Sequence, residues 1–131
     1  MKTLIIGKNY AINIAISGLL KSDDYRDLNY IHLGENLTND DIENISQASL
    51  VIIDLTSTTN NSKLFVQQIR QLNAKAIILA LHIYHEPEFI APIIEAGASA
   101  YLRLNTCSQE IETAIKLAQN EINGSAPDTQ K

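Results

Sequence analysis

The carboxylate of Asp54 is the side chain in this sequence best placed to do chemistry. It ends the apolar run Leu50-Val51-Ile52-Ile53, and such a run is typical of a strand buried on both faces of a parallel sheet. In open α/β sheets, ligands and reactions collect just beyond the carboxyl ends of the strands. The polar residues from Thr56 to Asn61 fit a loop at that place. The simpler interpretation is an aspartate that only caps the next turn. The other residues of the chain have to distinguish this interpretation from that of a functional carboxylate.

Two histidines that follow another apolar run could join Asp54 in a metal site. These are His82 and His85. Metal sites normally collect three or four protein ligands, whose orientation is fixed by outer hydrogen-bond partners. We find no further ligand, since His32 is predicted on a different strand. The sequence therefore favours a histidine at the edge of a pocket and no metal site.

Lys8 follows the first apolar run and is the nearest candidate partner for Asp54. A lysine in a loop is most often simply solvated. Here, however, Lys8 and Asp54 end strands predicted to be neighbours, and neighbouring strands lie only about 4.8 Å apart. We favour an ion pair between them, which would hold Asp54 in its ionised form.

Strands and helices alternate along the chain, and their order predicts how these residues are positioned. Strands are predicted at 3–6, 29–33, 49–54, 76–81 and 99–103. Amphipathic helices are predicted at 11–20, from Thr38 onward, at 64–72, at 89–96, and from Thr106 or Ser108 onward. Right-handed crossovers place the helices on both faces of a parallel sheet. The pattern predicts an α/β fold: a five-stranded parallel doubly wound sheet of flavodoxin-like order 2-1-3-4-5.

Composition limits the classes of function. The net charge of −5 argues against nucleic-acid binding by this segment, since phosphate contacts need a basic surface. A single cysteine, Cys107, excludes an internal disulfide framework and fits a reducing compartment. No stretch approaches the roughly 20 apolar residues of a membrane span, and Gly7-Lys8-Asn9 interrupts the apolar N-terminus too early for a signal peptide. We predict a cytoplasmic protein with no membrane partner.

The chain is predicted to form one domain over residues 1–122. Residues 123–131 contain glycine, serine and proline and read as a flexible tail, or as a linker to an output domain that this sequence does not contain.

Two segments resemble one known family. They are Ser49 to Leu55 and, more specifically, Pro87-Glu88-Phe89 together with the stretch from Glu95 to Leu102. Over residues 2–122 the chain resembles the receiver domain of bacterial two-component response regulators. Its Gly-Ala-x-x-Tyr-Leu pattern at 97–102 is similar to receivers that precede a LuxR-type helix-turn-helix. The resemblance implies a non-enzymatic signalling module, with a sensor kinase or another protein as partner, in a transcriptional regulator.

The resemblance also assigns five functional positions. In receivers an acid pair after the first strand holds Mg²⁺, an aspartate after the third accepts the phosphoryl group, and a Thr or Ser and a Lys after the last two strands bind its oxygens. Here the acid pair falls on Gly7 and Lys8, the acceptor on Asp54, the hydroxyl position on His82 and the lysine position on Leu104. Only the acceptor is kept.

This pattern predicts a pseudo-receiver. Phosphoryl transfer depends on positioning and on charge neutralisation by metal and cation, and Mg²⁺ prefers hard oxygen ligands. In a pocket of Gly7, Lys8, Thr56, His82 and Leu104, Asp54 alone supplies a carboxylate for a metal. Lys8 puts a cation where the metal would sit, and Leu104 removes the lysine that would bind the phosphoryl oxygens. We expect no catalytic residues, impaired phosphorylation, and no Mg²⁺ or other cofactor. The alternative is a receiver that still accepts a phosphoryl group on Asp54.

Two further residues bear on signalling. Tyr101 is most simply a half-buried aromatic of the sheet, and by resemblance it matches the switch aromatic of receivers. Pro92 falls inside the predicted fourth helix, so that helix is either kinked or begins late.

A flavin- or nucleotide-binding enzyme is the other class considered. The first turn, Gly7-Lys8-Asn9-Tyr10, lacks the glycine spacing of a phosphate-binding loop. No nucleophile-elbow motif is present either.

A homodimer, if one forms, is predicted to use the first and last helices. The last helix carries Leu117 outside the stripe made by Ile111 and Ile115, and an exposed apolar residue can seed a symmetric interface.

Overall fold

The computed structural model describes residues 1–20, 25, 27–32, 36–57 and 61–124. The strands are β1 (Lys2–Gly7), β2 (Asp27–His32), β3 (Leu50–Asp54), β4 (Ile77–His82) and β5 (Ala100–Arg103). The helices are α1 (Tyr10–Gly18), α2 (Asn39–Gln47), the short 3-10 turn η2 (Leu55–Ser57), α3 (Ser62–Leu72), α4 (Pro87–Glu95) and α5 (Ser108–Gly124).

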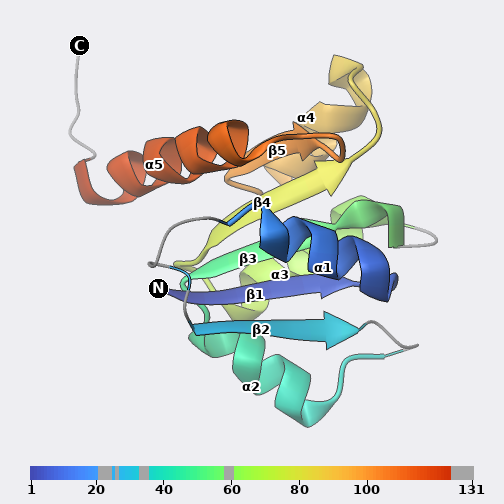
Figure 1. Cartoon of the computed structure of the whole chain (residues 1–131), viewed down its shortest axis with the longest axis vertical. Coiled ribbons are helices and arrows are strands. Elements are labelled where there is room, and N and C mark those ends of the chain that lie inside the picture. The colour runs from blue at the N-terminus through green and yellow to red at the C-terminus, as the bar shows by residue number, and fades with distance from the viewer. Residues whose placement is uncertain (21–24, 26, 33–35, 58–60, 125–131) are drawn as a thin grey trace.

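The strands form one parallel sheet in the order β2-β1-β3-β4-β5, as the sequence predicts (Figure 1). The register places Ile6 beside Ile53, and Asp54 beside Leu81. The C-terminal ends of β1, β3 and β4 therefore lie at the same end of the sheet. Gly7, Asp54 and His82 are the last residues of these three strands.

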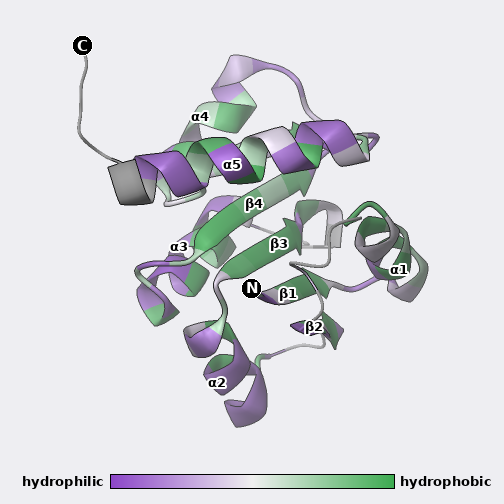
Figure 2. Ribbon diagram, turned by 60° about the vertical axis from the view of Figure 1, so that its left-hand side comes forward, coloured by the Kyte–Doolittle hydropathy of each residue, from purple (hydrophilic) through white to green (hydrophobic). Residues whose placement is uncertain are grey.

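Helices cover both faces of the sheet, and each face has its own core. Helices α1 and α5 bury Ile16, Ile111 and Ile115 against one face. Helices α2, α3 and α4 bury Ile45, Val66, Ile69 and Ile93 against the other. The central strands β3 and β4 are apolar along their length, while α2 and α5 have largely polar outer surfaces (Figure 2). A continuous apolar run is therefore the correct signal for these strands.

Local side-chain chemistry sets where several helices begin and end. Thr38 caps α2 in a capping box with Asp41, and Asn61 accepts from the amide of Leu64 at the start of α3. Helix α4 begins at Pro87 and contains Pro92, so it does not begin late. Gly97 follows this helix with φ of 127°, a conformation that side chains disfavour.

At the other end of the sheet, away from Asp54, two polar side chains near the C-terminal end of α3 hydrogen-bond to backbone groups of neighbouring elements. Asn73 is buried, and its amide nitrogen donates to the carbonyls of Ile45 and Ala48, each at 2.8 Å. Its amide oxygen accepts from the backbone amides of Lys75 and Ala76. Arg70 donates to the carbonyls of Gly97 and Ala76 at 2.7 and 2.8 Å, and burial lowers the pKa of its guanidinium. Together they join α2, α3, β4 and the turn before β5.

Most predicted boundaries agree with the structure to within two or three residues. Helix α5 extends to Gly124, two residues past the predicted end of the domain at 122. The last residue of the second predicted strand, Leu33, and the tail beyond residue 124 lie outside the described residues.

Candidate functional site

Asp54 is completely buried at the end of β3. One carboxylate oxygen, Oδ1, accepts from the backbone amide of Thr56 at 3.0 Å and also from the Thr56 hydroxyl. Both donors come from the 3-10 turn η2, which starts at the next residue. The turn therefore folds over the carboxylate and fixes one of its two oxygens.

Gly7 and Asn13 form the wall beside Asp54. A Cβ atom on Gly7 would lie 2.2 Å from Asn13 Oδ1 and 3.2 Å from Asp54 Cβ, so any larger residue would have to displace a neighbouring side chain. Asn13, from α1, is fully buried and donates to the Gly7 carbonyl at 3.1 Å and toward His32 Nδ1 at 3.4 Å. Its Oδ1 is the one buried side-chain polar atom of the described residues that has no hydrogen-bond partner. An amide side chain of α1 thus fills the space over the end of β1.

His82 lies at the end of β4 and is half-buried. Its Nδ1 accepts from the backbone amide of Ile83 at 2.8 Å, and its ring lies 4.6 Å from the ring of Tyr84. Burial lowers the pKa of His82, and the carboxylate of Asp54 opposes that shift. His82 therefore stands at the end of the strand next to β3 and lines a hollow together with Thr56; its role at the edge of a pocket around Asp54 stays a prediction.

Tyr101 is a half-buried residue of β5, in agreement with the simpler interpretation. Its hydroxyl donates to the Tyr84 carbonyl at 2.5 Å, which ties β5 to the loop between β4 and α4. Burial raises the pKa of the Tyr101 phenol. The Tyr84 ring in turn stacks on Phe89 of α4, with centroids 4.7 Å apart.

Lys8 and Leu104 occupy the two remaining predicted positions. Lys8 lies directly after β1 and is exposed; its pairing with Asp54 stays a prediction. Leu104 follows β5, and its backbone amide donates to the His82 carbonyl at 2.9 Å. Its side chain packs with the apolar core beneath α1 and α5. Leu104 therefore brings apolar surface, and no cation, to the end of β5.

Sequence reasoning missed Asn13. It stands three residues before Ile16, the other buried residue of α1, so helical spacing places it on the inward face. A polar residue at an inward position of an otherwise apolar helix is the signal that could have identified it.

Comparison with solved structures identifies the fold. A pilus assembly-related protein from Burkholderia pseudomallei superposes with a TM-score of 0.79 at 11% identity, over 96% of this chain and 94% of that one. A two-component response regulator from Clostridium difficile gives 0.74 at 15% identity, over 95% and 99%. A receiver domain from Methanospirillum hungatei gives 0.73 at 16% identity, over 95% and 98%. No family model and no curated protein matches the sequence.

These likenesses show that the chain has the fold of response-regulator receiver domains. None of the helices in the described residues is long and apolar enough to cross a membrane.

Proposed function

We propose that the chain is an atypical receiver, a pseudo-receiver that signals through protein contacts and not through its own phosphorylation. The observation that carries this proposal is the environment of Asp54. The carboxylate is fully buried, Thr56 occupies its Oδ1, and glycine, histidine and leucine stand at three of the positions that would handle metal and phosphate.

Transfer to Asp54 would require a carboxylate oxygen to reach the phosphorus of a donor, with cations to neutralise the developing charge. Burial opposes the first requirement. The second is poorly met, because Leu104 is apolar and the pKa of His82 is lowered, so that this histidine is neutral at pH 7. The strand-end pocket is thus built to keep Asp54 covered.

The residues also do not fit a magnesium ion. Mg²⁺ is usually held by one or two carboxylates, waters and substrate phosphates. In the described residues, the side-chain oxygens next to Asp54 come from the Thr56 hydroxyl and the Asn13 amide, not from a second carboxylate, and position 8 is a lysine. Within that part of the chain no three His, Cys, Asp or Glu side chains gather as a metal site. We derive no step through a metal ion.

A protein partner is the proposed ligand of the domain, either a sensor kinase or a component of an assembly. The structural likeness to response regulators supports a sensor kinase as the partner. The structural likeness to a pilus assembly-related protein supports a component of an assembly. A LuxR-type transcriptional regulator and a cytoplasmic location remain part of the proposal, on the Gly-Ala-x-x-Tyr-Leu pattern at 97–102 and the single cysteine. We propose no enzyme activity and no nucleic-acid contact for this segment.

Treatment with a small phosphodonor and Mg²⁺ is expected to leave the intact mass of the protein unchanged. The reason is the covered carboxylate without a metal site. The measurement is intact-mass spectrometry after incubation with acetyl phosphate, with a phosphorylatable receiver as positive control. Asp54→Asn serves as the negative control.

A stoichiometric, Mg²⁺-dependent gain of one phosphoryl group that Asp54→Asn abolishes would establish the alternative function, a receiver phosphorylated on Asp54. That alternative is favoured by one observation, the retention of aspartate at the end of β3.

A homodimer through α1 and α5 also belongs to the proposal, and the structure sharpens its test. Leu117 is 61% exposed, but it lines a groove of about 520 Å³ between α5 and the edge strand β5. Ile14, 40% exposed, is the apolar residue offered by α1. A dimer through α1 and α5 should be weakened by Ile14→Glu as well as by Leu117→Glu in sedimentation equilibrium. A dimer that responds to Leu117→Glu alone, or a monomer at high concentration, would contradict this arrangement.

A further inference from the structure

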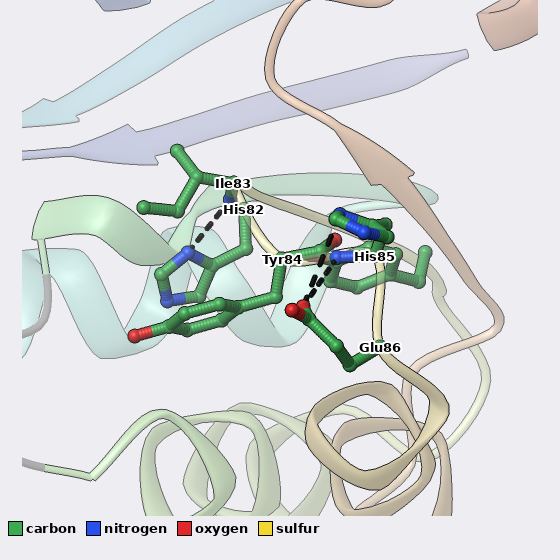
Figure 3. A network of polar contacts seen from close by, with 6 residues as sticks. His82, Ile83, Tyr84, His85 and Glu86 are labelled. Atoms are coloured by element: carbon green, nitrogen blue, oxygen red, sulfur yellow. Dashed lines mark hydrogen bonds and ion pairs between the residues drawn. The ribbon is translucent and has the colours of Figure 1, made fainter.

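A short series of contacts joins the pocket at Asp54 to the surface of β5. It begins at His82, whose Nδ1 accepts from the amide of Ile83, and whose ring lies beside that of Tyr84 (Figure 3). It continues through the Tyr84 carbonyl, which accepts the hydroxyl of Tyr101. Residues 83–86 connect β4 to α4. They contact His82 through the Ile83 amide and Tyr101 through the Tyr84 carbonyl. We call these residues the connecting loop.

The first contact depends on the protonation state of His82. An imidazole nitrogen accepts a hydrogen bond only when it carries no proton, so the Nδ1 contact requires neutral His82 with its proton on Nε2. In the imidazolium form, Nδ1–H would point at the N–H of Ile83. The hydrogen bond would be lost and two donors would oppose each other, so the ring and the amide have to separate.

Charged and titratable groups surround His82 on the elements packed against it. Asp54 of β3 acts on it electrostatically, and Arg103 is its register partner on β5. Lys63 of α3 and Glu88 of α4 line the same hollow of about 360 Å³. Within the connecting loop, His85 and Glu86 form an exposed contact at 3.9 Å. Asp54 favours the imidazolium form, whereas burial disfavours it more strongly, so the pKa of His82 lies below its ordinary value.

We propose that protonation of His82 releases the connecting loop and, with it, the hydroxyl of Tyr101. Uptake of a proton at His82, beside Asp54, thereby changes the surface of β5. The inference rests on the proposed pseudo-receiver function, because it supplies a trigger that needs no phosphoryl group. The Tyr101 ring reports the change, since its hydroxyl loses the Tyr84 carbonyl when the loop moves.

The sign of the pH effect follows from the lowered pKa. The folded state favours neutral His82, so its contacts are complete above the unfolded pKa of about 6.5. As the pH falls through that value and then through the lower folded pKa, the folded state loses stability relative to the unfolded one. The released form is therefore the acid form.

An NMR titration of the full, uniformly isotope-labelled chain from pH 8 to pH 5, with no phosphodonor, tests the proposal. The ring signals of Tyr101 and the amide of Ile83 are expected to titrate with the midpoint of His82. In His82→Asn, whose Oδ1 can keep the acceptor without titrating, the pH dependence of Tyr101 should disappear. By reciprocity, Tyr101→Phe should raise the midpoint of His82, since the neutral form loses a supporting contact.

His85→Asn is the matched control, because His85 is exposed and its hydrogen bond and ion pair are both made with Glu86 of the same loop. It should leave the Tyr101 titration unchanged. The proposal is overturned if Tyr101 is silent while His82 titrates, if the Tyr101 response persists in His82→Asn, or if His85→Asn removes it. Each of these results leaves the phosphodonor experiment unaffected, so the two proposals can fail separately.

Discussion

Replacing Asn73 with alanine is expected to lower the free energy of unfolding by about 3–5 kcal/mol, because several buried backbone groups lose their partners together and each unpaired group costs about 1–3 kcal/mol. These groups are the carbonyls of Ile45 and Ala48 and the amides of Lys75 and Ala76. Urea denaturation measures the loss, which corresponds to a fall of roughly 10–20 °C in Tm.

Asn73→Asp keeps the hydrogen-bond acceptor of this network and removes its donor at neutral pH. Its carboxylate can still accept from Lys75 and Ala76, but at neutral pH it faces the carbonyls of Ile45 and Ala48 without a donor. We therefore expect Asn73→Asp to be nearly as destabilising as Asn73→Ala at pH 7, and less so at pH 4, where the protonated acid can donate once. Asn105→Ala, at an exposed position, is the control and should stay within about 0.5 kcal/mol of the parent. A loss below about 1 kcal/mol for Asn73→Ala would show that the network is not needed.

The fold was predictable because its signals are local and repeated. The apolar runs of β3 and β4 have the composition of strands buried on both faces, and both are fully or almost fully buried. Thr38 with Asp41, and Gly97 after α4, mark helix ends through chemistry that each residue carries alone. Parallel strands with short helical crossovers then leave few topologies, so the sheet order followed from the sequence.

The site was only partly predictable, because it depends on which residues approach each other across the sheet edge. Asp54 and His82 could be placed there from strand ends alone. Helical spacing could place Asn13 on the inward face of α1, but its close approach to Gly7 could not be predicted, since that approach depends on the absence of a side chain at Gly7. The pairing of Lys8 with Asp54 stays a prediction, and the structure adds a buried amide, Asn13, next to Gly7 and Asp54.

Gly7→Ala is expected to lower the free energy of unfolding by about 2–3 kcal/mol, the range of overpacking in a well-filled interior. The new methyl group would lie 2.2 Å from Asn13 Oδ1 and 3.2 Å from Asp54 Cβ, so one of these side chains has to move. Asn13 moves more easily, because its Oδ1 has no partner to lose. Its displacement would still break the hydrogen bond to the Gly7 carbonyl.

A double-mutant cycle separates steric overlap from an effect on β1 itself. Asn13→Ala removes the atom that the new methyl group would strike, so adding Gly7→Ala to Asn13→Ala should cost less than about 1 kcal/mol. Thermal and urea denaturation of the parent, both single variants and the double variant give the coupling energy. Gly18→Ala is the control at a glycine with open space around its Cβ position. If Gly7→Ala were equally costly with and without Asn13, the close approach of Asn13 and Asp54 over Gly7 would not be what requires glycine at the end of β1.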